Sequence, residues 1–377
     1  MNSREAYIAL NMIDKLGPVR VRALVEALGE PAGVFTASYE DLIRVKGIGS
    51  ELAQGIIAQR DQVDPAAEEE KAAKLAARLV TFVDSDYPEL LKQIHDPPLA
   101  LYVQGTLVKK DRQSVAVVGT RRASHYGLSV ADRLGYQLSK CGLAVVSGLA
   151  RGIDSAAHQG ALKGGGRTIA VLGSALDTLY PPENADLARK IAAQGAVISE
   201  YTLGREADRT TFPYRNRIIS GMSMGSVVVE ADMKSGAMMT ADSALDQGRS
   251  VFAVPGRIDQ PGARGPHRLL KNGARLVEDI DDILQEFEML LPTDPLKKAA
   301  ALDSLPRVQL SSDEQAVLRA LFGEPLDVDS LARTAQLPMA KLSSMLLGLE
   351  MKRVIRMLPG RIVALAEGVR ELVAPDA

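Results

Sequence analysis

Tryptophan is absent from this chain, cysteine occurs once, and only 6 of the 377 residues are phenylalanine. The lone cysteine, Cys141, excludes an internal disulfide and a zinc site built on cysteine ligands. It ends a helical pattern just before Gly142, with no histidine near it in sequence, so we expect a packed structural thiol. The scarcity of aromatic side chains argues against a stacking platform of the RNA-recognition type.

Charge of one sign is not in excess, because the formal net charge is -2. The chain therefore lacks a global basic field, and any site for a polyanion must be a local patch. It also has neither a charged and then apolar leader nor a run of about 18 apolar residues, so nothing indicates export or a membrane partner. We expect a cytoplasmic protein.

The residue patterns that several kinds of catalytic site require are also absent from the sequence. None of the four histidines is paired with a second histidine or a cysteine at metal-ligand spacing. The Walker A and Gly-x-Ser-x-Gly patterns are absent, which argues against ATP hydrolysis and a serine nucleophile. His158 follows Asp154 by one helical turn, a spacing that can orient an imidazole as a base, but a packing role is favoured. The sequence predicts no metal and no cofactor.

What is present is an alternation of strands and helices. Apolar runs predict strands at residues 100–103, 115–118, 144–147, 168–172, 196–199, 226–230 and 251–254. Helical patterns fill the gaps, near residues 124–140, 153–163, 184–194, 215–222, 237–247 and 265–272. This alternation predicts an α/β domain with a doubly wound parallel sheet, over residues 66–290. Residues 66–80, rich in alanine, glutamate and lysine, predict a helix leading into it.

Residues 1–65 predict a separate helical domain. A Gly47-Ile-Gly49 turn lies between two helical patterns, and Leu16-Gly-Pro-Val19 is a weaker copy. The turn resembles a helix-hairpin-helix motif, whose backbone amides contact a DNA phosphate without reading sequence. A bundle of the sterile-alpha-motif (SAM) kind, which binds protein or nothing, fits equally well.

Residues 291–310 predict a linker punctuated by prolines, and residues 311–377 predict a winged helix. The winged-helix pattern consists of helices near 313–322, 327–335 and 339–352 and a β-hairpin turning at Pro359-Gly360. The third helix has Lys341 alone before Lys352 and Arg353. We therefore favour protein contact or a degenerate module over sequence-specific DNA reading.

The stretch Val115-Ala-Val-Val-Gly-Thr-Arg-Arg-Ala-Ser124 organises the candidate site. A buried strand, a tight turn and a helix start form the unit that binds phosphates. The turn has one glycine where a dinucleotide site has several, and Arg121 and Arg122 stand in their place. Guanidinium groups grip phosphates from the side chain, so the stretch predicts a phosphate site unlike a nucleotide pocket.

Further residues of the same kind follow the other strands. Arginines 151, 215 and 217 map to strand-end loops beside several glycines, which together predict a funnel for a polyanion. Gly236 opens a helix whose amides can take a phosphate, and Thr240 adds a hydroxyl. Phe212 either stacks on a base or anchors its loop. The candidate binding residues are Gly119, Thr120, Arg121, Arg122, Gly148, Arg151, Gly173, Phe212, Arg215, Asn216, Arg217, Ser235, Gly236 and Thr240.

Five motifs in combination resemble the DNA-processing protein A family, also called Smf, over about residues 80–285. They are Val115-Ala-Val-Val-Gly-Thr-Arg121, Ser147-Gly-Leu-Ala-Arg-Gly-Ile-Asp-x-x-Ala-His158, Phe212-Pro-x-Arg-Asn-Arg-Ile-Ile219, Val229-Glu-Ala-x-x-x-Ser-Gly-x-x-x-Thr-Ala241 and Gly248-Arg-x-Val-Phe-Ala-Val-Pro-Gly256.

The resemblance implies an extended Rossmann fold that binds single-stranded DNA. It implies a homodimer that loads the RecA recombinase onto that strand and protects incoming DNA during natural transformation, and it implies no enzyme activity. Arg121 would hold the DNA backbone, and Phe212, Arg215, Asn216 and Arg217 would line the same groove.

Two alternatives remain open. One is an enzyme like the Rossmann proteins that hydrolyse nucleotide N-glycosidic bonds, for which Glu200 and Glu230 are the candidate catalytic glutamates. The other is a DNA-binding regulator that acts through its winged helix.

Overall fold

The computed structural model describes residues 1–288, 312–321, 325–335, 337–351, 354–358 and 362–365. Its contacts divide the chain into two compact units, Met1–Leu291 and Pro292–Ala377. The expected linker, residues 291–310, lies outside the described residues. Among the residues that are described, no helix combines the length and the apolar character needed to cross a bilayer.

A nine-stranded sheet forms the centre of the first unit, in the order β1-β2-β6-β5-β4-β3-β7-β8-β9. Every neighbouring pair from β6 to β9 is parallel, so the predicted doubly wound parallel sheet is confirmed. The antiparallel strands β1 and β2 extend one edge. The strands are β1 Ala77–Thr81, β2 Ala100–Gly105, β3 Ser114–Val118, β4 Ala144–Ser147, β5 Thr168–Val171, β6 Ala196–Ser199, β7 Gly225–Val228, β8 Ser250–Ala253 and β9 Arg275–Leu276.

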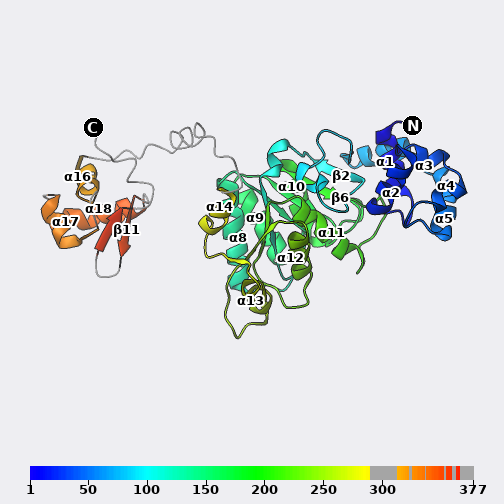
Figure 1. Ribbon diagram of the computed structural model, residues 1–377. Helices are drawn as coiled ribbons and strands as arrows, with labels where there is room; N and C mark the ends of the chain where they lie inside the picture. The colour runs from blue at the N-terminus through cyan, green and yellow to red at the C-terminus, as the bar shows by residue number, and fades with distance from the viewer. Residues whose placement is uncertain (289–311, 322–324, 336, 352–353, 359–361, 366–377) are drawn as a thin grey trace. The chain divides into compact units, whose positions relative to one another are not determined.

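Helices cover both faces of this sheet (Figure 1). In β3, Val115 and Val117 pack into one hydrophobic cluster, and Ala116 and Val118 into another on the opposite face. All five residues of β3 are buried, which is why the strand reads as a continuous apolar run. The helices are α7 Glu89–Lys92, α8 His125–Lys140, α9 Ile153–Lys163, α10 Ala185–Gln194, α11 Thr211–Gly221, α12 Gly236–Asp246, α13 Arg264–Lys271 and α14 Asp281–Glu288.

Six helices precede the sheet: α1 Ser3–Met12, α2 Pro18–Leu28, α3 Gly33–Thr36, α4 Tyr39–Ile43, α5 Ser50–Arg60 and α6 Pro65–Lys74. The first five gather at one end of the first unit (Figure 1, blue) around their own hydrophobic core. Gly17 and Gly49 have nearly the same extended backbone at the N-caps of α2 and α5. The two expected turn-to-helix copies therefore have equivalent geometry.

Three expectations for the first unit are wrong. The helix expected over residues 66–80 ends at Lys74, where Ala76 adopts a φ of 51° and leads into β1. Phe212, expected in a loop, lies in the first turn of α11, which begins at Thr211 and not near residue 215. Cys141 is exposed after the last turn of α8 and is not a packed thiol.

The second unit contains α16 Ser312–Ala320, α17 Val328–Thr334 and α18 Met339–Met351. The strands β10 Leu326–Asp327, β11 Ile355–Leu358 and β12 Ile362–Leu365 form an antiparallel sheet in the order β10-β12-β11. Three helices with this small sheet form the predicted winged helix, and β10 is an addition to it. The expected turn at Pro359-Gly360 lies outside the described residues.

Candidate nucleic-acid interface

A cleft of about 350 Å³ lies at the carboxyl ends of β3 and β7. Sheet order reverses here, because β4 to β6 lie to one side of β3 and β7 to β9 to the other. Ligands of open α/β sheets bind at such a switch point. Ten of the fourteen candidate residues line the cleft: Gly119, Thr120, Arg121, Arg122, Phe212, Arg215, Asn216, Ser235, Gly236 and Thr240.

Glu230 fixes the turn after β3. Its backbone carbonyl accepts a hydrogen bond from Thr120 N at 2.7 Å. Its carboxylate accepts from Ser124 N at 2.9 Å and from the Ser124 hydroxyl. Ser124 in turn caps α8, so Glu230 ties the turn to the start of that helix. The sequence did not show this role, because the partners are 106 residues apart.

Arg121 lies over an aromatic ring. Its guanidinium carbon is 4.7 Å from the centre of the Phe212 ring, and Phe212 contacts Tyr180 at 5.9 Å between ring centres. Gly173 leaves room for Phe212, since a Cβ there would lie 2.7 Å from the ring. Arg121 and Arg122 are both exposed and form no ion pair with the described residues. Two free cations therefore face the cleft.

Arg215 is buried beneath the cleft, only 4% exposed. Its guanidinium donates to the carbonyl of Gly148 at 2.7 Å and to that of Val171. Gly148 has no room for a side chain, because a Cβ would lie 2.5 Å from this guanidinium. Burial lowers the pKa of Arg215 to about 10, and the charge of Asp154 opposes that shift. Arg215 thus supports the loop after β4, although the sequence suggested an exposed loop residue.

Asp154 complements Arg215 from the start of α9. Its carboxylate accepts from Gly148 N at 3.1 Å and from Ala150 N at 3.3 Å. Burial raises the pKa of Asp154, while the charge of Arg215 acts in the opposite direction. His158, one turn later, is fully buried, as the sequence predicted.

Arg217 does not line the cleft, so the expectation that it shares the groove with Phe212 is wrong. Its side chain is 8% exposed and is paired with Asp96 at 3.1 Å and Glu200 at 2.5 Å. Two carboxylates beside one guanidinium leave little charge for a phosphate. Arg217 instead lines a groove on the other side of α11.

The start of α12 opens into the cleft. Ser235 precedes the helix, and its buried hydroxyl oxygen has no hydrogen-bond partner among the described residues. Asn216 donates to the Gly236 carbonyl at 3.0 Å, and the Thr240 hydroxyl donates to the same carbonyl at 3.3 Å. Since the first amides of a helix have no partner within it, this end can accept an anion.

The three remaining candidates lie beside the cleft. Gly148 and Arg151 line a small recess that Arg121 and Phe212 also border. Arg151 is exposed and pairs with Glu183. Gly173 acts through Phe212, as described above.

The two glutamates of the enzyme alternative are both engaged in structural contacts. Glu230 holds the turn after β3, and Glu200 is paired with Arg217 inside the first unit. The geometry therefore gives no support to either as a catalytic glutamate.

Family models match three stretches of the chain: the N-terminal helices, the sheet domain and the C-terminal winged helix. The family model for DNA recombination-mediator protein A matches residues 78–288, and that for the DprA winged helix domain matches residues 300–361. Residues 7–61 match a SAM-like helix-hairpin-helix tandem, a description that includes both expectations for the N-terminal helices.

Individual relatives match over most of their length. Protein Smf of Synechocystis sp. is 33% identical across 95% of this chain and 98% of its own. DNA processing protein A (DprA) of Streptococcus pneumoniae superposes with a TM-score of 0.66 at 33% identity, covering 76% of this chain and 98% of that one. A Helicobacter pylori DNA processing protein A, described for its single-stranded DNA binding mode, superposes with a TM-score of 0.51 at 29% identity. The match covers 57% of this chain and 97% of the H. pylori chain. The chain belongs to the DNA recombination-mediator protein A family, whose members are named DprA or Smf.

Proposed function

We propose that the cleft binds single-stranded DNA through its phosphate backbone. Family membership makes the protein a DNA-processing mediator and not an enzyme. The observation that carries the proposal is the pair Arg121 and Arg122, two exposed cations without ion pairs to described residues, beside the open start of α12. Phosphate contacts of this kind position a strand without reading its sequence. The H. pylori relative, described as a single-stranded DNA binder, supports the same ligand.

We further propose that the protein acts in the cytoplasm as a homodimer that protects incoming DNA and loads RecA during natural transformation. The family description as a recombination mediator supports this role. The test is the rate at which RecA assembles on single strands already coated by a single-strand binding protein. We expect the intact protein to accelerate assembly, and the same rate with and without it would contradict the loading role. Sedimentation of the free protein tests the dimer.

A salt titration tests the DNA site. Binding to single-stranded and double-stranded oligonucleotides is measured for the intact protein, Arg121→Ala and Arg189→Ala. Arg189 is an exposed arginine on α10 outside the cleft and serves as the matched control. We expect Arg121→Ala to weaken single-strand binding about 10- to 100-fold, as loss of a charge-assisted hydrogen bond does. The slope of log K against log salt should fall by about 0.7.

Equal binding by Arg121→Ala and Arg189→Ala would refute the role of Arg121. Release of free base from a nucleoside monophosphate would instead favour the N-glycosidase alternative.

A further inference from the structure

We propose that single-stranded DNA continues from the cleft into a second groove, between the N-terminal helices and the loop before α11. This inference rests on the proposed function of the cleft. The groove, here called the side groove, has a volume of about 420 Å³. Its lining includes Lys15, Gly17, Arg20, Arg205, Tyr214 and Arg217.

The first two turns of α11 separate the cleft from the side groove. Phe212, Arg215 and Asn216 line the cleft, whereas Tyr214 and Arg217 line the side groove. A strand that leaves the cleft across the start of α11 therefore enters the side groove directly. The two sites therefore share α11 as a wall.

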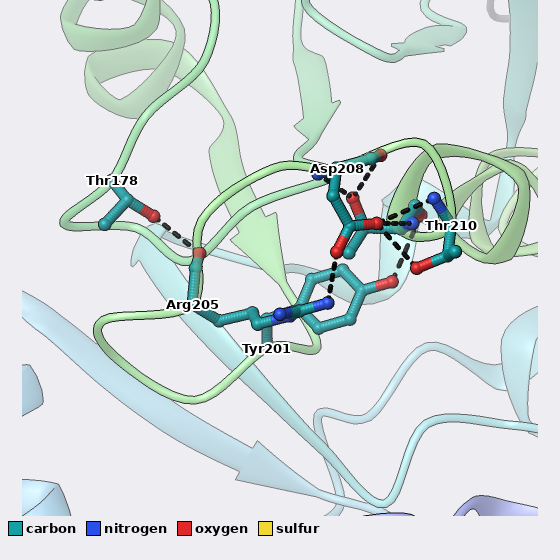
Figure 2. A network of polar contacts seen from close by, with 6 residues as sticks. Thr178, Tyr201, Arg205, Asp208 and Thr210 are labelled. Atoms are coloured by element: carbon teal, nitrogen blue, oxygen red, sulfur yellow. Dashed lines mark hydrogen bonds and ion pairs between the residues drawn. The ribbon is translucent and has the colours of Figure 1, made fainter.

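Both walls of the side groove are held in place. Asn11 of α1 donates to the Glu200 carbonyl at 3.2 Å and so joins the two walls. Figure 2 shows the polar network that fixes the loop before α11. In it, Asp208 accepts from Thr210 N at 2.6 Å, and the Thr178 hydroxyl donates to the Arg205 carbonyl at 2.6 Å. A groove fixed before binding loses little conformational entropy when a ligand enters.

Tyr214 provides a stacking surface at the junction. Its side chain is 62% exposed, although a tyrosine ring is largely apolar. Aromatic rings exposed along a nucleic-acid path stack on bases of any sequence, because every base has a flat face. Tyr214 belongs to the part of α11 that separates the two sites, and its ring centre is 6.0 Å from the guanidinium carbon of Arg217.

The side groove also offers donors for phosphate. Gly17 is the N-cap of α2, and a Cβ there would meet no described atom within 4 Å, so the helix start is open, although Pro18 has no N–H to donate. Arg20 donates to the Lys15 carbonyl at 2.7 Å, which places both cations at this helix start. The ion pairs Lys15–Glu51 and Arg205–Asp208 are exposed, and such pairs exchange readily for a phosphate.

Three buried polar atoms in this lining have no hydrogen-bond partner among the described residues. They are Arg217 Nε, Arg217 Nη1 and Glu200 Oε1, on side chains that are 8% and 11% exposed, and Nε forms an ion pair with Asp96 at 3.1 Å. A nucleotide presents both acceptors and donors, on its phosphate and on its base edge. The lining offers partners for both, because it combines cations such as Arg20 with the carboxyl group of Glu200. Asp14 is a further carboxylate in the lining and disfavours a compact anion.

The test is the dependence of affinity on strand length. Oligothymidylates of about 4 to about 16 nucleotides are bound to the full chain and to two groove variants, Tyr214→Ala and the double variant Lys15→Gln, Arg20→Gln. Tyr136→Ala and Arg189→Gln are matched controls, since both residues are exposed and lie outside the two sites. We expect the intact protein and both controls to gain affinity with length.

Tyr214→Ala should lose about 5- to 100-fold in affinity for the long strand and keep its affinity for the short one. Tyr214→Phe should keep the affinity of the intact protein for the long strand, because the ring is retained. In the double variant the salt slope for the long strand should fall by about 0.7 for each cation that contacts a phosphate.

Unchanged length dependence in both groove variants would overturn the second groove and leave the cleft intact. If those variants instead slow RecA assembly without changing DNA affinity, the groove receives a protein and the proposal is wrong. Failure of the cleft itself has a different signature, since Arg121→Ala would then bind short strands normally.

Discussion

His158 should make the folded protein sensitive to acid well above the pH at which carboxylates titrate. The imidazole is fully buried, and its Nδ1 lies 2.7 Å from the Thr168 hydroxyl oxygen. That hydroxyl donates to the Val145 carbonyl at 2.8 Å, so Nδ1 carries the proton and Nε2 does not. Nε2 has no hydrogen-bond partner in the described part of the chain. Burial, together with the charge of Arg215, lowers the pKa of His158 from 6.5 to about 3.

The sign of the effect follows from which state takes up the proton. Between pH 6.5 and pH 3 the unfolded chain binds a proton at this histidine and the folded chain does not. Stability from the neutral imidazole is therefore complete above pH 6.5 and is lost as the pH falls. The loss approaches about 1.4 kcal/mol per pH unit and amounts to about 2.3 kcal/mol between pH 6.5 and pH 4.5.

The assay is urea unfolding of the intact protein, His158→Asn and His125→Gln, followed by circular dichroism at several pH values. Asparagine keeps a donor near Thr168 but cannot titrate, and His125 is an exposed control at the start of α8. The difference in the free energy of unfolding between the intact protein and His158→Asn should shrink by this loss as the pH falls from 6.5 to 4.5. The difference between the intact protein and His125→Gln should not. An advantage over His158→Asn that stays constant from pH 6.5 to pH 4.5 would refute the buried neutral imidazole.

Two further variants test other contacts of the site. Gly173→Ala should weaken single-strand binding several-fold in the salt titration, because its Cβ displaces the ring beneath Arg121. Gly55→Ala, whose Cβ would meet only Gln59 at 3.8 Å, should bind normally, and equal affinities would contradict this support for Arg121. Glu200→Gln should lower the free energy of unfolding by about 3–5 kcal/mol, because Arg217 loses a buried partner. Glu183→Gln, which removes the exposed partner of Arg151, should leave the melting temperature unchanged, and equal shifts in the two variants would count against the buried pair.

The strands of the sheet could be predicted because their signal is local. Residues 115–118 form an unbroken apolar run that is rich in valine, and the structure buries both faces of that strand. The turn at Ala76 had no such signal. An alanine rarely adopts a positive φ, so the chain read as a helix up to residue 80 although it turns into β1 after Ala76.

The arginines of α11 could not be separated by sequence alone. Arg215 and Arg217 are two residues apart in a basic, polar stretch, and the stretch resembled a loop that faces DNA. Their different roles depend on distant partners, since Arg217 pairs with Asp96 and Arg215 binds the Val171 carbonyl. Contacts across 44 and 121 residues leave no local pattern.

The contact between Arg121 and the Phe212 ring has a consequence for the speed of the proposed DNA binding. An arginine held by a carboxylate must break that pair before it can bind a phosphate, so one anion is exchanged for another. An aromatic face attracts the guanidinium without occupying its N–H donors. Arg121 can therefore bind a phosphate while its guanidinium remains on the ring. Such a contact suits the proposed role of holding a strand and then passing it on.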